Sequence, residues 1–247
     1  MTGSGTASYR RLSVSERRAQ LIATALSLFA HRAPEDVSLD EVAAAARVSR
    51  PLVYRYFPGG KQQLYEAALR SAADDLELCF AEPEAGPLSG RLGAVLERYL
   101  AFVDEHDAGF SALLRGGSVA ETSGTGRTGA IVDEVRRAAA AQILKHLSVP
   151  DPGVRLRLMV RTWIATVEAA SLTWLDEGKL PPRDELRDWL VEQFVALLLT
   201  TGAGDAQTGE VARAALAAEP AEGPVGDLAR RLAPLVGEAG HLHGHLH

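Results

Sequence analysis

Between residues 38 and 61 the chain gathers side chains that could read the edges of bases in a nucleic-acid duplex. The planar fork of Arg50 can donate two hydrogen bonds to the O6/N7 edge of a guanine, the commonest specific contact in the major groove. Leu52, two residues later, can touch a thymine methyl group. Arg55 can contact either a base or the backbone. The stretch therefore predicts a surface that recognises duplex DNA.

The same stretch carries donors suited to phosphate oxygens, which fix the register of a protein on a duplex. Tyr54 and Tyr56 combine apolar rings with donating hydroxyl groups, although Tyr56 can equally be half core. Ser38 and the N–H groups at the start of its helix are neutral donors, and Lys61 adds a charge. Together the candidate DNA-contacting residues are Ser38, Ser49, Arg50, Leu52, Tyr54, Arg55, Tyr56 and Lys61.

The charge distribution agrees with such a surface. The 247-residue chain carries a formal net charge of −6, from 26 Lys and Arg against 32 Asp and Glu. Residues 1–61 hold nine basic and five acidic residues, so this part is at +4 and the remainder at −10. A basic end on an acidic body suits a protein that presents one end to a polyanion, although ordinary unevenness in an Arg-rich sequence is the alternative.

Short helices must position these residues. Ser13 with Glu16, and Ser38 with Glu41, have the spacing of capping boxes that open two helices. The first carries an apolar stripe of Ala19, Ile22, Leu26 and Phe29, and the second points Leu39, Val42, Ala43 and Ala46 inward. Ser49 opens a third helix with Pro51 in its first turn, and a longer helix starts at Lys61. Two short helices joined by a tight turn are a helix-turn-helix arrangement.

The segment Ser38–Leu64, SLDEVAAAARVSRPLVYRYFPGGKQQL, resembles the DNA-binding signature of the TetR family of bacterial transcriptional regulators. The matching features are the capped supporting helix, Val48-Ser49 closing the turn, the Tyr54-x-Tyr56-Phe57 cluster and the lysine of the fourth helix. In that family the position of Tyr54 is a phosphate contact. The resemblance implies a homodimer that binds a palindromic operator and is released by a small-molecule effector, most simply as a repressor.

Two positions depart from the family pattern. Arg47 stands where the family usually has glycine in the turn, so a positive φ there would strain the backbone. Gly59-Gly60 adds one residue before Lys61, which weakens the expectation that Lys61 contacts phosphate and leaves Tyr54 as the stronger candidate.

The remainder of the chain is predicted to be helical, which makes the fold all-α. We expect a helix-turn-helix domain at 1–60, a ligand-binding and dimerisation bundle at 61–203, and an extension at 204–247 that is partly helical or disordered. The helix at about 152–178 carries two apolar stripes, one through Leu156 and Trp163 and the other through Leu158, Ala165 and Leu172. A helix that is apolar on two sides must be covered on both, and the second cover is most simply another copy of the protein.

The candidate ligand-binding residues of the bundle are Phe102, Phe110, Trp163, Glu168 and Trp174. Aromatic residues at helical spacing are also ordinary core, and Glu168 with Arg161 can equally form an ion pair at a dimer interface. The Gly116–Gly129 segment is predicted to be a loop. The histidines that end the chain are interpreted as a surface tail, and we expect neither a metal site nor a cofactor.

Other classes of protein fit less well. The single cysteine, Cys79, excludes an internal disulfide and is interpreted as a small buried residue of the fourth helix. No histidine has the spacing of a catalytic or metal site, so we do not expect an enzyme. No apolar run reaches the roughly 18 residues of a membrane span, and the polar start of the chain is unlike a signal peptide, so a cytoplasmic location without a membrane partner is expected. A helical small-molecule carrier or interaction module without DNA binding remains the alternative.

Overall fold

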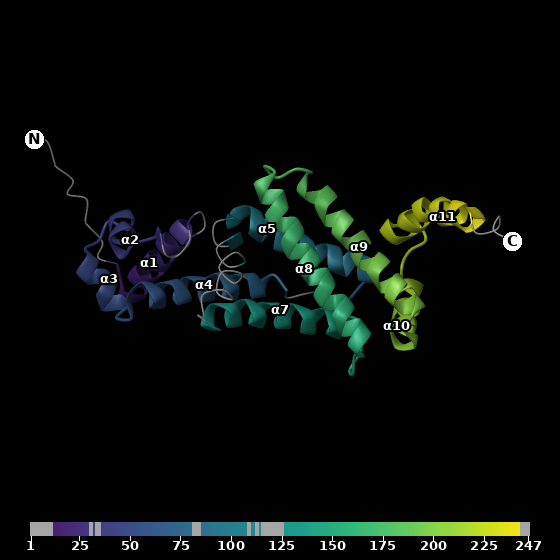
Figure 1. Cartoon of the computed structure of the whole chain (residues 1–247), viewed down its shortest axis with the longest axis horizontal. Helices are drawn as coiled ribbons and strands as arrows, with labels where there is room; N and C mark the ends of the chain where they lie inside the picture. The colour runs from purple at the N-terminus through teal and green to yellow at the C-terminus, as the bar shows by residue number, and fades with distance from the viewer. Residues whose placement is uncertain are drawn as a thin grey trace, which may run out of the picture. The chain divides into compact units, whose positions relative to one another are not determined.

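The computed structural model describes residues 12–29, 32, 36–80, 85–107, 110, 111, 114 and 126–242. These residues form helices and turns with no strand among them, which confirms the all-α fold class. The helices, shown in Figure 1, are α1 (Val14–Phe29), α2 (Leu39–Ala45), α3 (Arg50–Tyr56), α4 (Gly60–Leu78), α5 (Leu88–Glu105), α7 (Gly126–His146), α8 (Val154–Asp176), α9 (Arg183–Ala203), α10 (Ala206–Ala217) and α11 (Pro224–Leu242). None of these helices is long and apolar enough to cross a membrane.

The chain divides into two compact units. Residues 1–72 and 108–129 belong to the first, and residues 73–107 and 130–247 to the second. Helix α4 therefore begins in the first unit and ends in the second. The expected domain limits at residues 60 and 203 remain predictions.

In the first unit, both predicted capping boxes are present. The Ser13 hydroxyl accepts from the backbone N–H of Glu16, whose carboxylate accepts from the N–H of Ser13. Ser38 and Glu41 make the same reciprocal pair at the start of α2. These bonds satisfy backbone donors that a helix cannot satisfy internally, so they fix where α1 and α2 begin.

The core of the first unit needs one correction. Helix α1 buries Leu21, Ile22, Ala25 and Phe29, whereas Ala19 is exposed and Leu26 only half-buried. The buried stripe is thus displaced by part of a turn from the predicted one, because Leu21 and Ala25 lie on the side that meets the other helices. Phe29 packs edge-on against Tyr65 of α4, with ring centroids 4.8 Å apart.

The turn between α2 and α3 has the hydrogen bonds of a Schellman motif. The N–H of Val48 donates to the carbonyl of Ala43 and the N–H of Arg47 to that of Ala44, which satisfies two carbonyls at the end of α2. Arg47 takes the left-handed position at φ 54°, where glycine is the usual residue. Arg47 therefore has the positive φ on which the expected strain depends. From α1, the Gln20 side-chain amide donates to the carbonyl of Ala46 and braces this turn.

Helix α9 is the central helix of the second unit and contacts α5, α8, α10 and α11. The indole of Trp163 on α8 packs edge-on against Phe194 of α9 and donates to the carbonyl of Leu190. Helix α10 packs against α9 at Gly202 and Gly209, where a Cβ on Gly202 would lie 3.0 Å from the Cα of Gly209. The absence of side chains at this crossing allows the two backbones to meet.

The segment after α10 returns to α5. The Glu219 carboxylate accepts hydrogen bonds from both the backbone N–H and the hydroxyl of Ser89, so it caps the start of α5. The extension after residue 203 is therefore helical in α10 and α11, and it contacts the bundle. Residues 243–247, with three of the four terminal histidines, lie outside the described residues.

Two local expectations differ from the structure. The predicted Gly116–Gly129 loop is too long, because α7 already begins at Gly126; residues 116–125 lie outside the described part. Cys79 was expected to be buried within the fourth helix, but it lies in the turn after α4 and is half-buried. Burial raises the pKa of its thiol.

The left-handed turn generates the first prediction. Replacing Arg47 with glycine should raise the thermal midpoint of the free protein, because a non-glycine residue in this conformation costs about 1 kcal/mol. Arg47→Ala is the matched control, since it removes the same side chain and charge but keeps the Cβ. Thermal unfolding by circular dichroism measures both, and a midpoint for Arg47→Gly at or below that of Arg47→Ala contradicts the strained turn.

Candidate nucleic-acid interface

Helix α3 exposes most of the residues predicted to contact DNA. Arg50, Tyr54 and Arg55 are exposed, with Tyr54 at 41%. Leu52 and Tyr56 are half-buried. Only Val53 within the helix, and Phe57 directly after it, are fully in the core. One residue thus anchors the helix while its remaining faces stay accessible.

Ser49 occupies the N-cap position of α3, as predicted, with extended backbone angles. Its side chain makes no capping hydrogen bond, while its carbonyl accepts from the N–H groups of Leu52 and Val53. Pro51 lies in the first turn, where a missing N–H removes no helical bond. The Ser49 hydroxyl is exposed, so contact with a phosphate remains possible for it.

Arg50 is held by two neighbours. Its Nη1 donates to Oδ2 of Asp40 on α2 at 2.9 Å. The carbon of its guanidinium lies 5.7 Å from the ring centroid of Tyr54, one turn further along α3. The Tyr54 hydroxyl and, after it, the Asp40 carboxylate raise the pKa of Arg50. The first turns of α2 and α3 are therefore joined through one arginine side chain.

Ser38 has a structural role in the free protein. Its hydroxyl donates to the Glu41 carboxylate at 2.8 Å and accepts from the Glu41 backbone N–H at 3.2 Å. Arg32 donates to the other oxygen of this carboxylate at 2.6 Å. The bond from Arg32, followed by those from the backbone and side chain of Ser38, lowers the pKa of Glu41 from 4.5 to about 2. A contact from the Ser38 hydroxyl to phosphate would have to replace its bond to Glu41.

Gly60, directly before Lys61, has a backbone conformation that favours glycine. Gly60 begins α4 at φ 70°, a conformation that side chains disfavour. Its N–H donates to the Phe57 carbonyl at 2.9 Å, which turns the chain directly into α4. Lys61 follows on the first turn and is half-buried. The extra residue is thus accommodated by a left-handed glycine, and the phosphate contact of Lys61 stays a prediction.

Comparison with known proteins identifies this arrangement. Residues 21–68 match the family described as bacterial regulatory proteins, tetR family, and residues 88–197 match the tetracyclin repressor-like C-terminal domain. A crystal structure of a tetR-family transcriptional regulator from Streptomyces coelicolor is 53% identical, with a TM-score of 0.81. That match covers 92% of this chain and 100% of the other. The chain belongs to the TetR family. It is a DNA-binding transcriptional regulator with a helix-turn-helix in its first unit.

Two further relatives are more distant. The HTH-type transcriptional activator FasR of Mycolicibacterium smegmatis is 30% identical over 113 residues, which are 45% of this chain. The match spans only about half (51%) of that relative's length. The TetR-like regulator LfrR of Mycobacterium smegmatis, solved with proflavine, is 23% identical, with a TM-score of 0.54 over 74% of this chain and 96% of LfrR. This last similarity concerns the fold alone.

The aromatic candidates for ligand binding are packed in the interior. Trp163 is 4% exposed and bridges α8 to α9, and Trp174 donates from its indole to the carbonyl of Pro181 at 2.7 Å. Phe102 stacks on His106, with centroids 4.7 Å apart. Phe110 is buried and belongs to the first unit. The core alternative therefore accounts for their burial, and ligand binding by any of them remains a prediction.

Glu168 has a partner within its own chain. It accepts a forked pair of hydrogen bonds from Nε and Nη2 of Arg136 on α7, the shorter at 2.9 Å. The bond to Glu168 raises the pKa of Arg136. Within the chain Arg136 reaches Glu168 from a neighbouring helix while Arg161 is exposed, and an ion pair between Glu168 and Arg161 at a dimer interface stays a prediction. The Glu168 side chain is only 16% exposed, so it stays close to the interior of the bundle.

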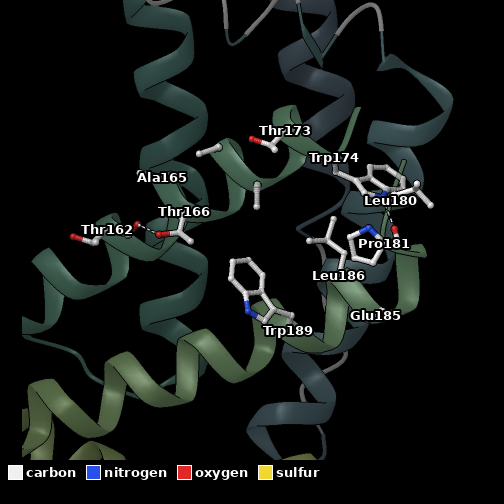
Figure 2. A pocket seen from close by; sticks show the side chains of 12 residues that line it. Thr162, Ala165, Thr166, Thr173, Trp174, Leu180, Pro181, Glu185, Leu186 and Trp189 are labelled. Atoms are coloured by element: carbon white, nitrogen blue, oxygen red, sulfur yellow. Dashed lines mark hydrogen bonds between the residues drawn. The ribbon is translucent and has the colours of Figure 1, made fainter. Parts of the chain in front are cut away.

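A groove runs between α8 and α9 on the surface of the second unit (Figure 2). It encloses about 800 Å³. Small residues of α8 form one wall, and Trp189 of α9 projects from the other. Trp189 is 44% exposed. The small α8 residues in the wall are Thr162, Ala165, Thr166, Ala169, Ala170 and Thr173, and Trp174 of α8 also lines the groove.

The groove includes Ala165 of the second apolar stripe that the sequence predicts for α8. The first stripe, through Leu156 and Trp163, is buried. Leu158 of the second is 64% exposed, Ala165 is exposed and Leu172 is half-buried. Within the part of the chain that the structure describes, only one of the two apolar faces is therefore covered.

The sequence analysis missed Asp40, Arg136 and Trp189. Asp40 precedes Arg50 by ten residues, and Arg136 precedes Glu168 by thirty-two, so helical spacing could not pair them. Trp189 was one of three tryptophans in the sequence, and its position opposite the small residues of α8 depends on the packing of two helices.

The lowered pKa of Glu41 predicts an acid-sensitive first unit. A carboxyl group whose folded pKa is depressed stabilises the folded state above its unfolded pKa, and this contribution disappears as the pH falls through the folded value. The advantage of the wild type over Glu41→Gln should therefore be complete above pH 4.5 and decline toward pH 2. Thermal midpoints measured over this pH range give the comparison, and a difference that does not vary with pH contradicts the assignment.

Proposed function

We propose that this chain acts as a homodimer that binds a pseudo-palindromic operator through α3 and that a small molecule releases it. The observation that carries the proposal is the exposed face of α3, with Arg50, Tyr54 and Arg55 accessible on a helix held by Val53. In a helix-turn-helix the second helix enters the major groove, and two such helices on a two-fold axis read two half-sites. Repression is the simplest outcome, because a bound dimer excludes other proteins from the operator.

The groove between α8 and α9 supports a dimer. In a two-fold dimer the same patch faces itself, so a surface with small residues on one side and a tryptophan on the other can be self-complementary. We propose that the partner's Trp189 and α8 cover the exposed stripe containing Leu158 and Ala165. Burial of this stripe by the partner would account for the two-sided apolar pattern that the sequence predicts for α8.

Release by an effector needs a difference in affinity between two states. A ligand lowers operator affinity only if it binds the DNA-incompetent spacing of the two α3 helices more tightly than the competent one. Helix α4 belongs to both units, so we propose that it transmits the change. LfrR was solved with proflavine, and a small-molecule effector is proposed here by analogy with it.

Selection of duplexes from a random pool tests the proposal. The wild-type protein should enrich a pseudo-palindrome, and its affinity should fall steeply as salt rises, because phosphate contacts release counterions. Candidate effectors added during selection should deplete the bound fraction. A helical carrier without DNA binding would enrich no sequence at any salt concentration, and that result overturns the proposal. FasR is described as an activator, so a reporter fused to the selected operator should decide between repression and activation.

Substitutions of Arg50 and of Tyr54 should affect DNA binding in different ways. Arg50→Ala should relax the preference at one base pair per half-site, at a cost of about 1–3 kcal/mol, because the arginine reads a base edge. Tyr54→Phe should weaken all duplexes by similar factors, because a phosphate contact carries no sequence information. Fluorescence anisotropy on the selected operator and on single-base variants separates the two. Uniform weakening by Arg50→Ala would make Arg50 a phosphate contact instead.

A charge placed in the α8–α9 groove should weaken the proposed dimer. Ala169→Glu places a carboxylate in the proposed dimer interface and should shift the protein toward monomer, since an unpaired buried charge is strongly unfavourable. Ala141→Glu is the matched control, because Ala141 is an exposed alanine on α7. Sedimentation equilibrium measures the association. If both variants remain as dimeric as the wild type, the α8–α9 groove is not the interface.

A further inference from the structure

We propose that Asp40 is a positioning residue that makes Arg50 selective for its base. This inference rests on the proposed function, since it assigns a role to a contact within the DNA-binding face. The observation is the hydrogen bond from Arg50 Nη1 to Asp40 Oδ2 at 2.9 Å, together with the Tyr54 ring beneath the guanidinium. The two contacts restrain one flexible side chain from two directions.

The contact does little for folding. Both side chains are largely exposed, Arg50 at 53% and Asp40 at 63%, and exposed ion pairs contribute little because water and salt screen them. The helices that carry the two residues are already positioned by the buried Val42, Val53 and Phe57. The pair is therefore better suited to setting the direction of the Arg50 side chain than to holding α2 against α3.

The geometry leaves Arg50 able to bind a guanine. A guanidinium has five N–H donors, and Asp40 uses one of them, so a planar edge remains for the O6 and N7 acceptors. An unrestrained arginine can turn equally well toward a phosphate, which would raise affinity without raising specificity. The Asp40 carboxylate beside Arg50 holds the guanidinium away from the DNA backbone and repels its phosphates. The restraint also removes rotamer freedom before binding, so less is lost when the base contact forms.

If the Asp40 carboxylate positions Arg50, its replacement should change the ratio of affinities for two duplexes that differ by one base pair. Asp40→Asn should reduce the ratio of affinities between the best operator and its single-base variant by about 2- to 10-fold, the effect expected from releasing one ordered side chain. Non-specific duplexes should bind more tightly at the same time, because a negative charge beside the duplex is lost. Asp36→Asn removes the same charge from an exposed position before α2 and should leave the ratio unchanged.

The double variant isolates the pair. In an Arg50→Ala background, Asp40→Asn should no longer change the preference at that base pair, since the residue it positions is absent. A thermal midpoint for Asp40→Asn close to that of the wild type confirms that the variant is folded. Anisotropy titrations measure the affinities of the wild type, the two single variants and the double variant. Each protein is titrated on the best operator, on its single-base variant and on one unrelated duplex.

Three outcomes contradict the inference. If Asp40→Asn strengthens binding to every duplex by the same factor, the carboxylate merely competes with DNA for Arg50. If it changes base preference equally in the Arg50→Ala background, Asp40 reads a base itself. If it leaves all affinities as in the wild type, the pair has no role in recognition. A wild type that binds no duplex at all refutes the proposed function, and is thereby distinguished from these three.

Discussion

A helix of seven residues is not stable in water by itself, because nucleating the first turn fixes several residues for a single hydrogen bond. Helix α3 has this length, so its position depends on the burial of Val53 and Phe57 in the core of the first unit. Arg18 of α1 lies over the Phe57 ring, with its guanidinium carbon 5.3 Å from the centroid. Since one face of one turn anchors the helix, the other side chains need not pack, and they are free to have the types that recognise a duplex. Stability and recognition are thus assigned to different residues of the same short helix.

The turn before α3 shows the same division at the level of the backbone. The carbonyls of Ala43, Ala44 and Ala46 all accept hydrogen bonds in this turn. None of these bonds uses the Arg47 side chain, so the turn would also close with glycine at position 47. Arginine stands there instead, in a left-handed conformation that side chains disfavour. Its exposed, positive side chain lies directly before the helix that is proposed to enter the groove. A residue that is unfavourable for folding and favourable near a polyanion is what one expects where recognition is the stronger constraint.

Local features of the fold could be predicted from the sequence, and contacts between distant residues could not. The capping boxes at Ser13 and Ser38 depend on residues within a few positions of one another, and both were predicted. The glycine usual at position 47 in the family pointed to the turn where Arg47 has a positive φ. The buried stripe of α1 was displaced because Leu21 and Ala25 become core only through the helices that they meet. The partners of Arg50 and Glu168 lie on other helices, and the α8–α9 groove depends on how two helices pack. The chemical types of the candidate DNA-contacting residues could be listed from sequence, but their partners required the fold.

The position of α9 links the two proposed roles of the second unit. Helix α9 contacts α5 and α8 in the interior, and its Trp189 lines the groove that we assign to the partner. Trp163 joins α8 to α9 from within, while Trp174 lines the groove beside Leu180 and Pro181. A ligand that moved α8 relative to α9 would therefore change the shape of the proposed dimer surface, because the same pair of helices forms both. Interfaces that pack closely do not deform continuously, so a small shift would favour one of two arrangements of the protomers. Since each protomer of the proposed dimer carries its own α3, such a change would alter the distance between the two helices that are proposed to enter one operator.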